Sequence, residues 1–376
     1  MANLGELSMR KTLIALAVLG MSAGFAHAQS NVTIYGVVDT GYVKQTGRDL
    51  RMGANEDNRL GFRGTEDLGG GLKATFQLER RFEVYDGTLG NKGQPTYRYH
   101  QGDSSPDWGG QTTIGLSGDW GAVRLGRINE LTTETIRRFD PFNQFSVGSM
   151  IYSTQRTARI DNTIRYDSPK WSGFSFGATY SLGANAKNEN TGGRDHDGYG
   201  INLSYGNGPL SLTGNWSRVA DSDKSYVWNM AGAYKFGAVK LSLLYEKTND
   251  KGFRARYTSG RNWGLESGPD AISTKGKTDN WLLGLTADVG PGQLGASVSY
   301  FRIKNEAINT RDLVSADKSR NNMKYALGYT YNLSKRTSVY AIASYTDYKS
   351  ENVGLFYTGL KRESVTGMQV GMTHKF

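Results

Sequence analysis

Residues 59–79 read RLGFRGTEDLGGGLKATFQLE, and this stretch decides the fold. After the glycines at 69–71, the apolar residues Leu72, Ala74, Phe76 and Leu78 alternate with polar or charged residues. Strict alternation is typical of a β-strand with one apolar and one wet face, because successive side chains point to opposite sides. Glycines supply the backbone angles that a tight turn needs. The stretch therefore predicts a β-hairpin with one face in apolar surroundings.

The same alternation returns in segment after segment along the rest of the chain, and the connections between segments are of two kinds. Short, turn-like connections lie at 67–70, 117–121, 168–173, 206–209, 236–238, 289–292 and 332–336. Long polar connections lie at about 44–57, 86–110, 129–157, 183–196, 220–225, 248–277, 305–319 and 349–361. Seven short and eight long connections alternate and separate sixteen strands. Short turns at one end and long loops at the other are typical of a transmembrane β-barrel. We predict an all-β, antiparallel barrel with short periplasmic turns and long extracellular loops.

The last strand keeps alternating up to the final residue. Met368, Val370, Met372, His374 and Phe376 share one face, and the chain ends on the aromatic ring. Chain termini usually fray unless they are tied down. In a closed barrel the last strand must pair with the first, since no strand edge can stay unpaired in lipid.

The composition fits a barrel and excludes a helical membrane protein. Only 37% of the residues are hydrophobic, and the mean hydropathy is −0.54. No segment of the mature chain approaches the roughly 18 consecutive apolar residues of a spanning helix. In a barrel only alternate residues face lipid. The net charge of +10 is spread along the chain without a basic tail, and we predict no nucleic-acid partner.

The N-terminus has the features of an export signal. Arg10 and Lys11 precede an apolar run at 12–26, and Ala26-His27-Ala28 supplies the small residues of a cleavage site. This order is typical of a secretory signal peptide. We predict a signal peptide at residues 1–28 and a single barrel domain at 29–376. Met9 is an alternative start, because it is followed directly by the two basic residues.

Several segments resemble the general porins of Neisseria and Burkholderia type. They are NVTIYGVVD at 31–39, RLGFRGTEDLGGGLKA at 59–74, LGR at 125–127, NTIRY at 162–166 and GMTHKF at 371–376. The resemblance runs over the whole mature chain. It implies a trimeric, sixteen-stranded outer-membrane barrel that passes small hydrophilic solutes, with lipid or lipopolysaccharide around it. It also implies that the barrel assembly machinery binds the last strand, with Phe376 as the assembly signal.

The resemblance further implies that the third long connection, at 129–157, folds into the pore and narrows it. This connection carries Arg137 and Arg138 together with the acidic residues Glu130, Glu134 and Asp140. Some members of the family favour anions through basic residues on the wall that faces this loop.

Strand alternation selects the residues that face the lumen. Because Leu60, Phe62, Val123 and Leu125 are expected to face lipid, their neighbours are expected to face inward. The predicted basic wall consists of Arg59, Arg63, Lys73, Arg81, Arg124, Arg159 and Arg165, with acidic counterparts Glu79, Asp161 and Asp167. Charged groups that line a constriction set ion preference electrostatically. The basic excess predicts a preference for anions.

Motifs for catalysis and metal binding are missing from the sequence. It has no Cys, and none of its four His has a partner at metal-ligand spacing. No nucleophile elbow or phosphate-binding loop occurs. We therefore predict no enzyme activity, no cofactor and no metal. Two alternatives stay open: an outer-membrane barrel enzyme with a Ser/His or Asp/His pair at its rim, and a soluble β-sandwich that binds a ligand.

Overall fold

A computed structural model describes residues 31–89, 107–143, 146–150, 159–182, 197–218, 225–255, 272–309, 320–349 and 362–376. The expected signal peptide at 1–28 lies outside these residues, as does most of the second long connection.

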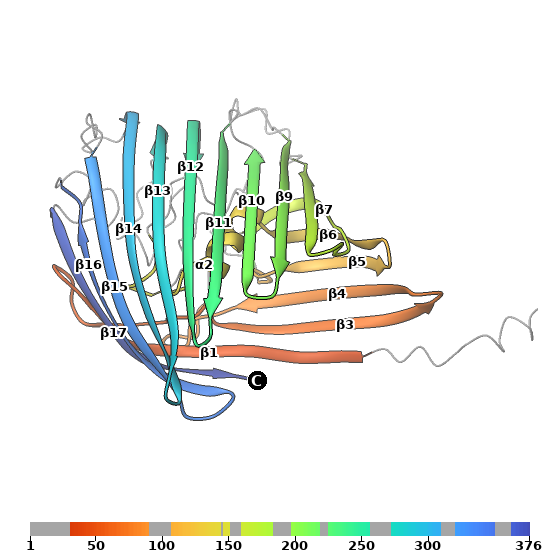
Figure 1. Ribbon diagram of the computed structural model, residues 1–376, viewed down its shortest axis with the longest axis horizontal. Helices are drawn as coiled ribbons and strands as arrows, with labels where there is room; N and C mark the ends of the chain where they lie inside the picture. Colours follow the sequence, from red (N-terminus) through yellow and green to blue (C-terminus); the bar gives the residue numbers. More distant parts are fainter. Residues whose placement is uncertain are drawn as a thin grey trace, which may run out of the picture.

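The described residues form one antiparallel sheet of seventeen strands (Figure 1). The strands are β1 Asn31–Gln45, β2 Arg51–Gly53, β3 Arg59–Gly69, β4 Leu72–Arg81, β5 Thr112–Gly118, β6 Gly121–Asn129, β7 Arg159–Asp167, β8 Phe174–Ser181, β9 Gly198–Asn207, β10 Leu210–Arg218, β11 Tyr226–Phe236, β12 Val239–Ala255, β13 Ile272–Val289, β14 Gly292–Asn309, β15 Arg320–Asn332, β16 Thr337–Asp347 and β17 Ser364–Lys375. The three-residue β2 lies inside the first long connection and pairs with β1. The other sixteen strands form the wall, which confirms the sixteen-stranded antiparallel barrel.

The first and last strands close the barrel. β1 pairs with β3 through its N-terminal half and with β17 through its C-terminal half. The backbone N–H of Gly36 donates to Phe376 O at 3.0 Å, and Phe376 N–H donates to Gly36 O at 3.2 Å. A Cβ atom on Gly36 would overlap the ring of Phe376. The aromatic C-terminus is thus packed onto the first strand, and no backbone edge is left open at this point.

Seven short connections join β3–β4, β5–β6, β7–β8, β9–β10, β11–β12, β13–β14 and β15–β16, as the sequence predicts. The long connection predicted at 248–277 is shorter than expected. β12 runs on to Ala255, and β13 begins at Ile272, with one irregularity in their pairing between Lys251 and Phe253. Polar residues can extend a strand in this way, because the ladder satisfies the backbone whatever the side chain.

The two faces of the wall differ in polarity. Ile114, Ile201, Leu283 and Leu327 each expose more than half of their surface on the outer face. Asn215, Asn229 and Gln369 are buried on the inner face. An apolar outer band around a polar interior is expected of a barrel in lipid. Among the residues that the structure describes, no helix is both long and apolar enough to cross a membrane.

One helix, α2 Leu131–Phe139, follows β6 in the third long connection, where the sequence showed no helical pattern. Glu130 caps its N-terminus by accepting a hydrogen bond from Thr133 N–H at 2.9 Å. At its C-terminus Asp140 N–H donates to Ile136 O at 2.7 Å. The helix was missed because it is short and rich in threonine, and its apolar residues are too few to set a period. In Figure 1 it lies within the curve of the sheet.

Candidate functional site

The described residues of the third long connection, 129–143 and 146–150, lie along the inner face of the wall. Asn229 Nδ2 on β11 donates to Thr132 O at 2.9 Å, and Ser242 Oγ on β12 donates to Phe139 O at 2.7 Å. Both donors alternate with outward-facing Met230 and Leu241. The inner face therefore holds the backbone of α2 through polar side chains.

An apolar patch on the same wall receives the helix. Leu244 on β12 and Leu282 on β13 have no exposed surface, and they cluster with Ile136 and Phe139 of the helix. These leucines interrupt the alternation of their strands, since Leu243 and Leu283 beside them face outward. An apolar residue on the wet face is the sequence signal for a segment that covers it from inside.

The connection then continues to the far side of the lumen. Phe142 packs with Tyr340 and Ile342 on β16. Val147 N–H donates to Gln369 Oε1 on β17 at 3.1 Å. We call the inner-face residues that receive the connection the loop seat: Ala231, Leu244, Leu282, Tyr340 and Ile342. The segment thus spans the lumen from β6 to β17.

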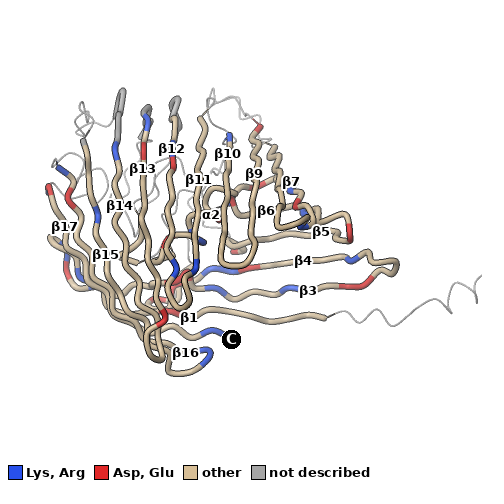
Figure 2. Tube along the Cα trace, in the orientation of Figure 1, with Lys and Arg blue, Asp and Glu red and all other residues tan. Residues whose placement is uncertain are grey.

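A cluster of arginines lies on the opposite wall around one carboxylate. Arg81 Nη1 is 2.5 Å from Asp57 Oδ2, and Arg159 Nη2 is 3.2 Å from the same oxygen. Arg81 also reaches Glu79 at 2.9 Å, and Arg59 lies 3.9 Å from Glu79. Figure 2 shows these charged segments at the ends of β3 and β4 near α2. We call Arg59, Arg81 and Arg159 with Asp57 and Glu79 the arginine cluster.

The pKa of the Asp57 carboxyl shows that positive charge predominates in the cluster. Burial alone would raise the pKa of this carboxyl, but Arg81, Arg159, Arg137 and Arg59 together hold it below its usual range. Arg137 belongs to α2, so the helix adds a cation to a cluster whose other arginines come from the wall. Asp57 stays ionised and neutralises part of this charge.

A second group of charges lies further along the same wall. Arg165 Nη1 on β7 is 2.9 Å from Glu134 Oε2 of the helix, and Arg165 Nη2 is 2.8 Å from Asp167. Arg124 Nη2 on β6 reaches the same Asp167 at 2.5 Å. The acidic residue of α2 is thus connected directly to the basic wall.

The remaining predicted site residues are placed apart. Arg63 lies over the ring of Tyr35 and, with Arg124, lines a polar cavity of about 390 Å³ toward the short turns. Lys73 is exposed at the turn end of β4, opposite Asp67. Glu130 and Asp140 are buried and bind backbone N–H groups at the two ends of the helix. The seven basic residues therefore do not form one cluster.

Strict alternation missed one arginine of the site. It assigns Arg127 to the lipid face with Val123 and Leu125, yet the Arg127 guanidinium binds Asp161 and is buried. The pairing of β6 with β7 shifts between Gly126 and Ile128, and Gly126 has φ 128°. Between these pairs the two β7 residues Asp161 and Asn162 lie opposite the single β6 residue Arg127, so the bulge is on β7, where Asn162 has φ 52°. A β-bulge disrupts the pairing locally and re-aims side chains beside it. Asp57 was missed for another reason: nothing in a polar loop marks which residue turns inward.

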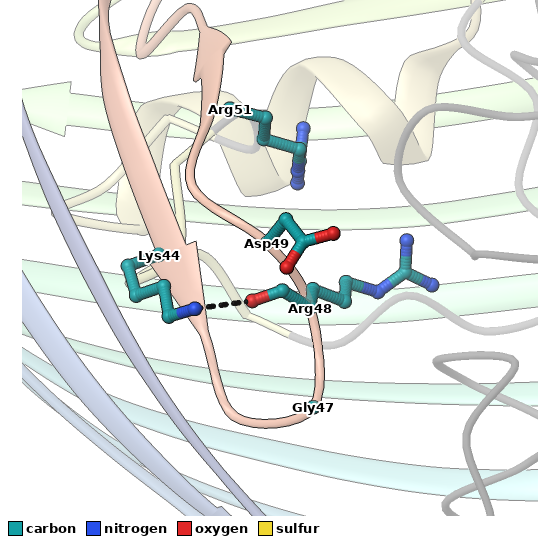
Figure 3. A pocket seen from close by; sticks show the side chains of 5 residues that line it. All are labelled: Lys44, Gly47, Arg48, Asp49 and Arg51. Atoms are coloured by element: carbon teal, nitrogen blue, oxygen red, sulfur yellow. Dashed lines mark hydrogen bonds between the residues drawn. The ribbon is translucent and has the colours of Figure 1, made fainter.

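The first long connection also carries a basic pocket (Figure 3). Lys44, Arg48, Asp49 and Arg51 line a cavity of about 540 Å³ with Gly47 at the turn. Lys44 Nζ donates to Arg48 O at 2.7 Å and closes the turn. Cations therefore lie at the long-loop end as well as on the wall. Within the described ranges, no group of three or more His, Asp or Glu could hold a metal ion.

Comparison with known proteins agrees with this architecture. The model of the Gram-negative porin family matches residues 15–351. An outer membrane porin protein of Bordetella pertussis is 32% identical, over 98% of this chain and 100% of the relative. Outer membrane porin protein 32 of Delftia acidovorans is also 32% identical, with the same coverage. A solved structure described as an anion-selective porin from Comamonas acidovorans matches with a TM-score of 0.67 and 27% identity, over 93% of this chain and 100% of that one.

Proposed function

The chain belongs to the Gram-negative porin family, and we propose that its pore favours anions. It is an outer-membrane porin, a water-filled channel for passive diffusion of small hydrophilic solutes and ions. Its relatives are channel proteins, and we propose that this chain likewise carries out no reaction chemistry.

The arginine cluster is the observation that carries the anion preference. Arg59, Arg81, Arg159 and Arg137 surround Asp57, so four guanidiniums face one central carboxylate, with Glu79 beside it. An anion that passes gains Coulomb energy from this surplus, and a cation is repelled. The third long connection lies across the lumen and, in this proposal, narrows the path so that ions pass close to the cluster. A solved relative described as anion-selective supports the same assignment.

The test is a reversal potential. The refolded protein would be inserted in a planar lipid bilayer under a gradient of potassium chloride, and current would be recorded against voltage. We expect discrete conductance steps and a reversal potential of anion sign. A reversal potential of cation sign would contradict the proposal while leaving the channel in place.

Three further features complete the proposal. Residues 1–28 are removed on export, which the mass of the protein extracted from outer membranes would test. The barrel assembles as a homotrimer in lipid and lipopolysaccharide, as the family resemblance implies, and chemical cross-linking would test the trimer. The assembly machinery binds β17 through Phe376, so Phe376→Ala should lower the amount of folded barrel in cells.

A further inference from the structure

A second group of cations lies at the short-turn end of the lumen, away from the arginine cluster. A pocket of about 200 Å³ is lined there by Arg138, Lys235, Lys240, Asp288 and Gln293, together with Asp140, Pro141 and other residues. Lys235 and Lys240 belong to β11 and β12 next to their short turn, and Arg138 comes from the last turn of α2. The pocket therefore lies where the helix meets the wall.

The cations of this pocket are close to one another. Lys235 and Lys240 are directly opposite in the pairing of β11 with β12, and Lys240 Nζ donates to the backbone carbonyl of Arg138 at 3.5 Å. The charges of Arg138 and Lys235 both act on the Lys240 ammonium. Like charges directly opposite in a sheet are destabilising, and an anion between them would relieve the repulsion.

The carboxylates of the pocket compensate only part of this charge. Asp288 Oδ2 lies 3.9 Å from Lys235 Nζ, and its other oxygen accepts from Gln293 Nε2 at 3.1 Å. Asp140 turns its two oxygens to the backbone N–H groups of Phe142 and Met150, and it is buried. Three cations thus face one carboxylate that points into the pocket.

The roof of the pocket is held in place. Ser242 Oγ binds Phe139 O, and a Cβ atom on Gly284 would overlap Pro141. The backbone next to Arg138 is therefore held in place, and Arg138 lines the pocket with the two lysines while its guanidinium lies 5.4 Å from the centroid of the Phe139 ring. A guanidinium binds oxyanions through paired N–H groups, and lysines add mobile point charges.

We propose that this pocket is a second anion-binding station, which takes small divalent oxyanions of the phosphate type. The inference rests on the proposed anion pathway and deepens it. α2 divides its two basic residues between the stations: Arg137 acts at the arginine cluster, and Arg138 acts at the pocket. An oxyanion leaving the cluster toward the short turns would be held here before release.

The probe is inorganic phosphate, and the readout is chloride current through single channels in planar bilayers. We expect phosphate to reduce the chloride current of the wild-type protein. The double variant Lys235→Gln/Lys240→Gln should need at least about tenfold more phosphate for half of that reduction, because two charge-assisted contacts are lost. Lys335→Gln/Arg336→Gln removes two positive charges from the exposed β15–β16 turn and should respond like the wild type.

Two outcomes would overturn the proposal: a wild-type current that phosphate leaves unchanged, or a double variant with wild-type sensitivity. If Arg81→Gln/Arg159→Gln abolishes the phosphate effect and the lysine variant keeps it, phosphate binds the arginine cluster and the pocket is not a station. If the double variant does not fold, Lys235→Gln alone is tested for its sensitivity to phosphate. The Lys235 side chain is 57% exposed, so we expect this substitution to leave folding intact. A wild-type reversal potential of cation sign contradicts the proposed function, whereas loss of the phosphate effect in the lysine variant would still support the pocket.

Discussion

The two sides of the lumen wall belong to the same antiparallel sheet, but their inward-facing side chains differ: one side is charged and the other is largely apolar. On β3, β4 and β7 the inward positions carry guanidiniums that are paired with carboxylates. On β11 to β16 the inward positions of the loop seat carry Ala, Leu, Ile and Tyr side chains buried under the third long connection. One side supplies the charge that ions meet, and the other holds the segment that crosses the lumen. Pore width and ion preference therefore depend on different residues and can be changed separately.

The largest effect is expected from the loop seat. Leu244→Ala removes a fully buried side chain beneath α2, and such substitutions cost about 2–5 kcal/mol. The helix should leave the wall more often, which raises single-channel conductance and its noise. The matched control is Leu243→Ala, which changes an outward-facing neighbour and should leave conductance unchanged. Equal conductance in the two variants would show that the seat does not hold the loop.

The next effect concerns the arginine cluster. Arg81→Gln/Arg159→Gln leaves Asp57 and Glu79 without their closest cations, and the two remaining guanidiniums, Arg59 and Arg137, only balance the two carboxylates. We expect the reversal potential to lose most of its anion sign and to move towards zero. Breaking buried pairs costs roughly 3–5 kcal/mol, so heat-modifiable gel migration should shift to lower temperature. Arg336→Gln, in an exposed short turn, is the control. An unchanged reversal potential would place the selectivity elsewhere.

A smaller effect of opposite direction is expected from Asp57→Asn. Removing the central carboxylate leaves Glu79 as the one carboxylate of the arginine cluster, so the permeability ratio of chloride to potassium should rise. Because surrounding arginines lower the pKa of Asp57, the carboxylate stays ionised below the ordinary value of about 3.9. The difference between variant and wild type should therefore persist from pH 7 down to about pH 4. A difference that disappears on acidification within this range would contradict the assignment.

The lowered pKa of Asp57 also predicts how the stability of the folded protein depends on pH. A carboxyl whose pKa is lower in the folded state stabilises the protein above its unfolded pKa and loses that contribution as pH falls through the folded value. Wild-type barrels should thus lose more stability than Asp57→Asn only in strong acid, below the usual range of the carboxyl, as unfolding temperatures would show.

The smallest effect is expected from Glu134→Gln. Glu134 binds Arg165 across the lumen side of α2, but it is 34% exposed and Arg165 keeps Asp167 as a partner. Partly exposed ion pairs contribute about 1 kcal/mol or less. We expect a slight rise in anion preference, measured by reversal potential, without a change in conductance. A conductance as high as that of Leu244→Ala would mean that this ion pair holds the loop.

Much of the site could be predicted where alternation holds, and less where it breaks. The alternation predicts that Arg59, Arg81, Arg159 and Arg165 face the lumen, and the structure places each of them in an ion pair of the two charged groups. Alternation alone does not place Arg127 on the lumen side, because the bulge in β7 opposite Arg127 disrupts the regular pairing. Leu244 and Leu282 place apolar side chains on the wet face of their strands, and they form part of the seat of the third long connection. The anomalies in the pattern mark the places where a second segment covers the wall.

The sequence by itself determined the barrel, the sixteen strands, the division into short and long connections, and the basic character of one wall. Each of these depends on local periodicity, and a period-two pattern is readable one strand at a time. Only the tertiary structure decided which arginines meet. Asp57, Arg81 and Arg137 come from two loops and a strand far apart in the chain, and their contact depends on closure of the wall and on packing of α2 across it. Contacts across a closed lumen leave no local pattern, because no single segment carries them.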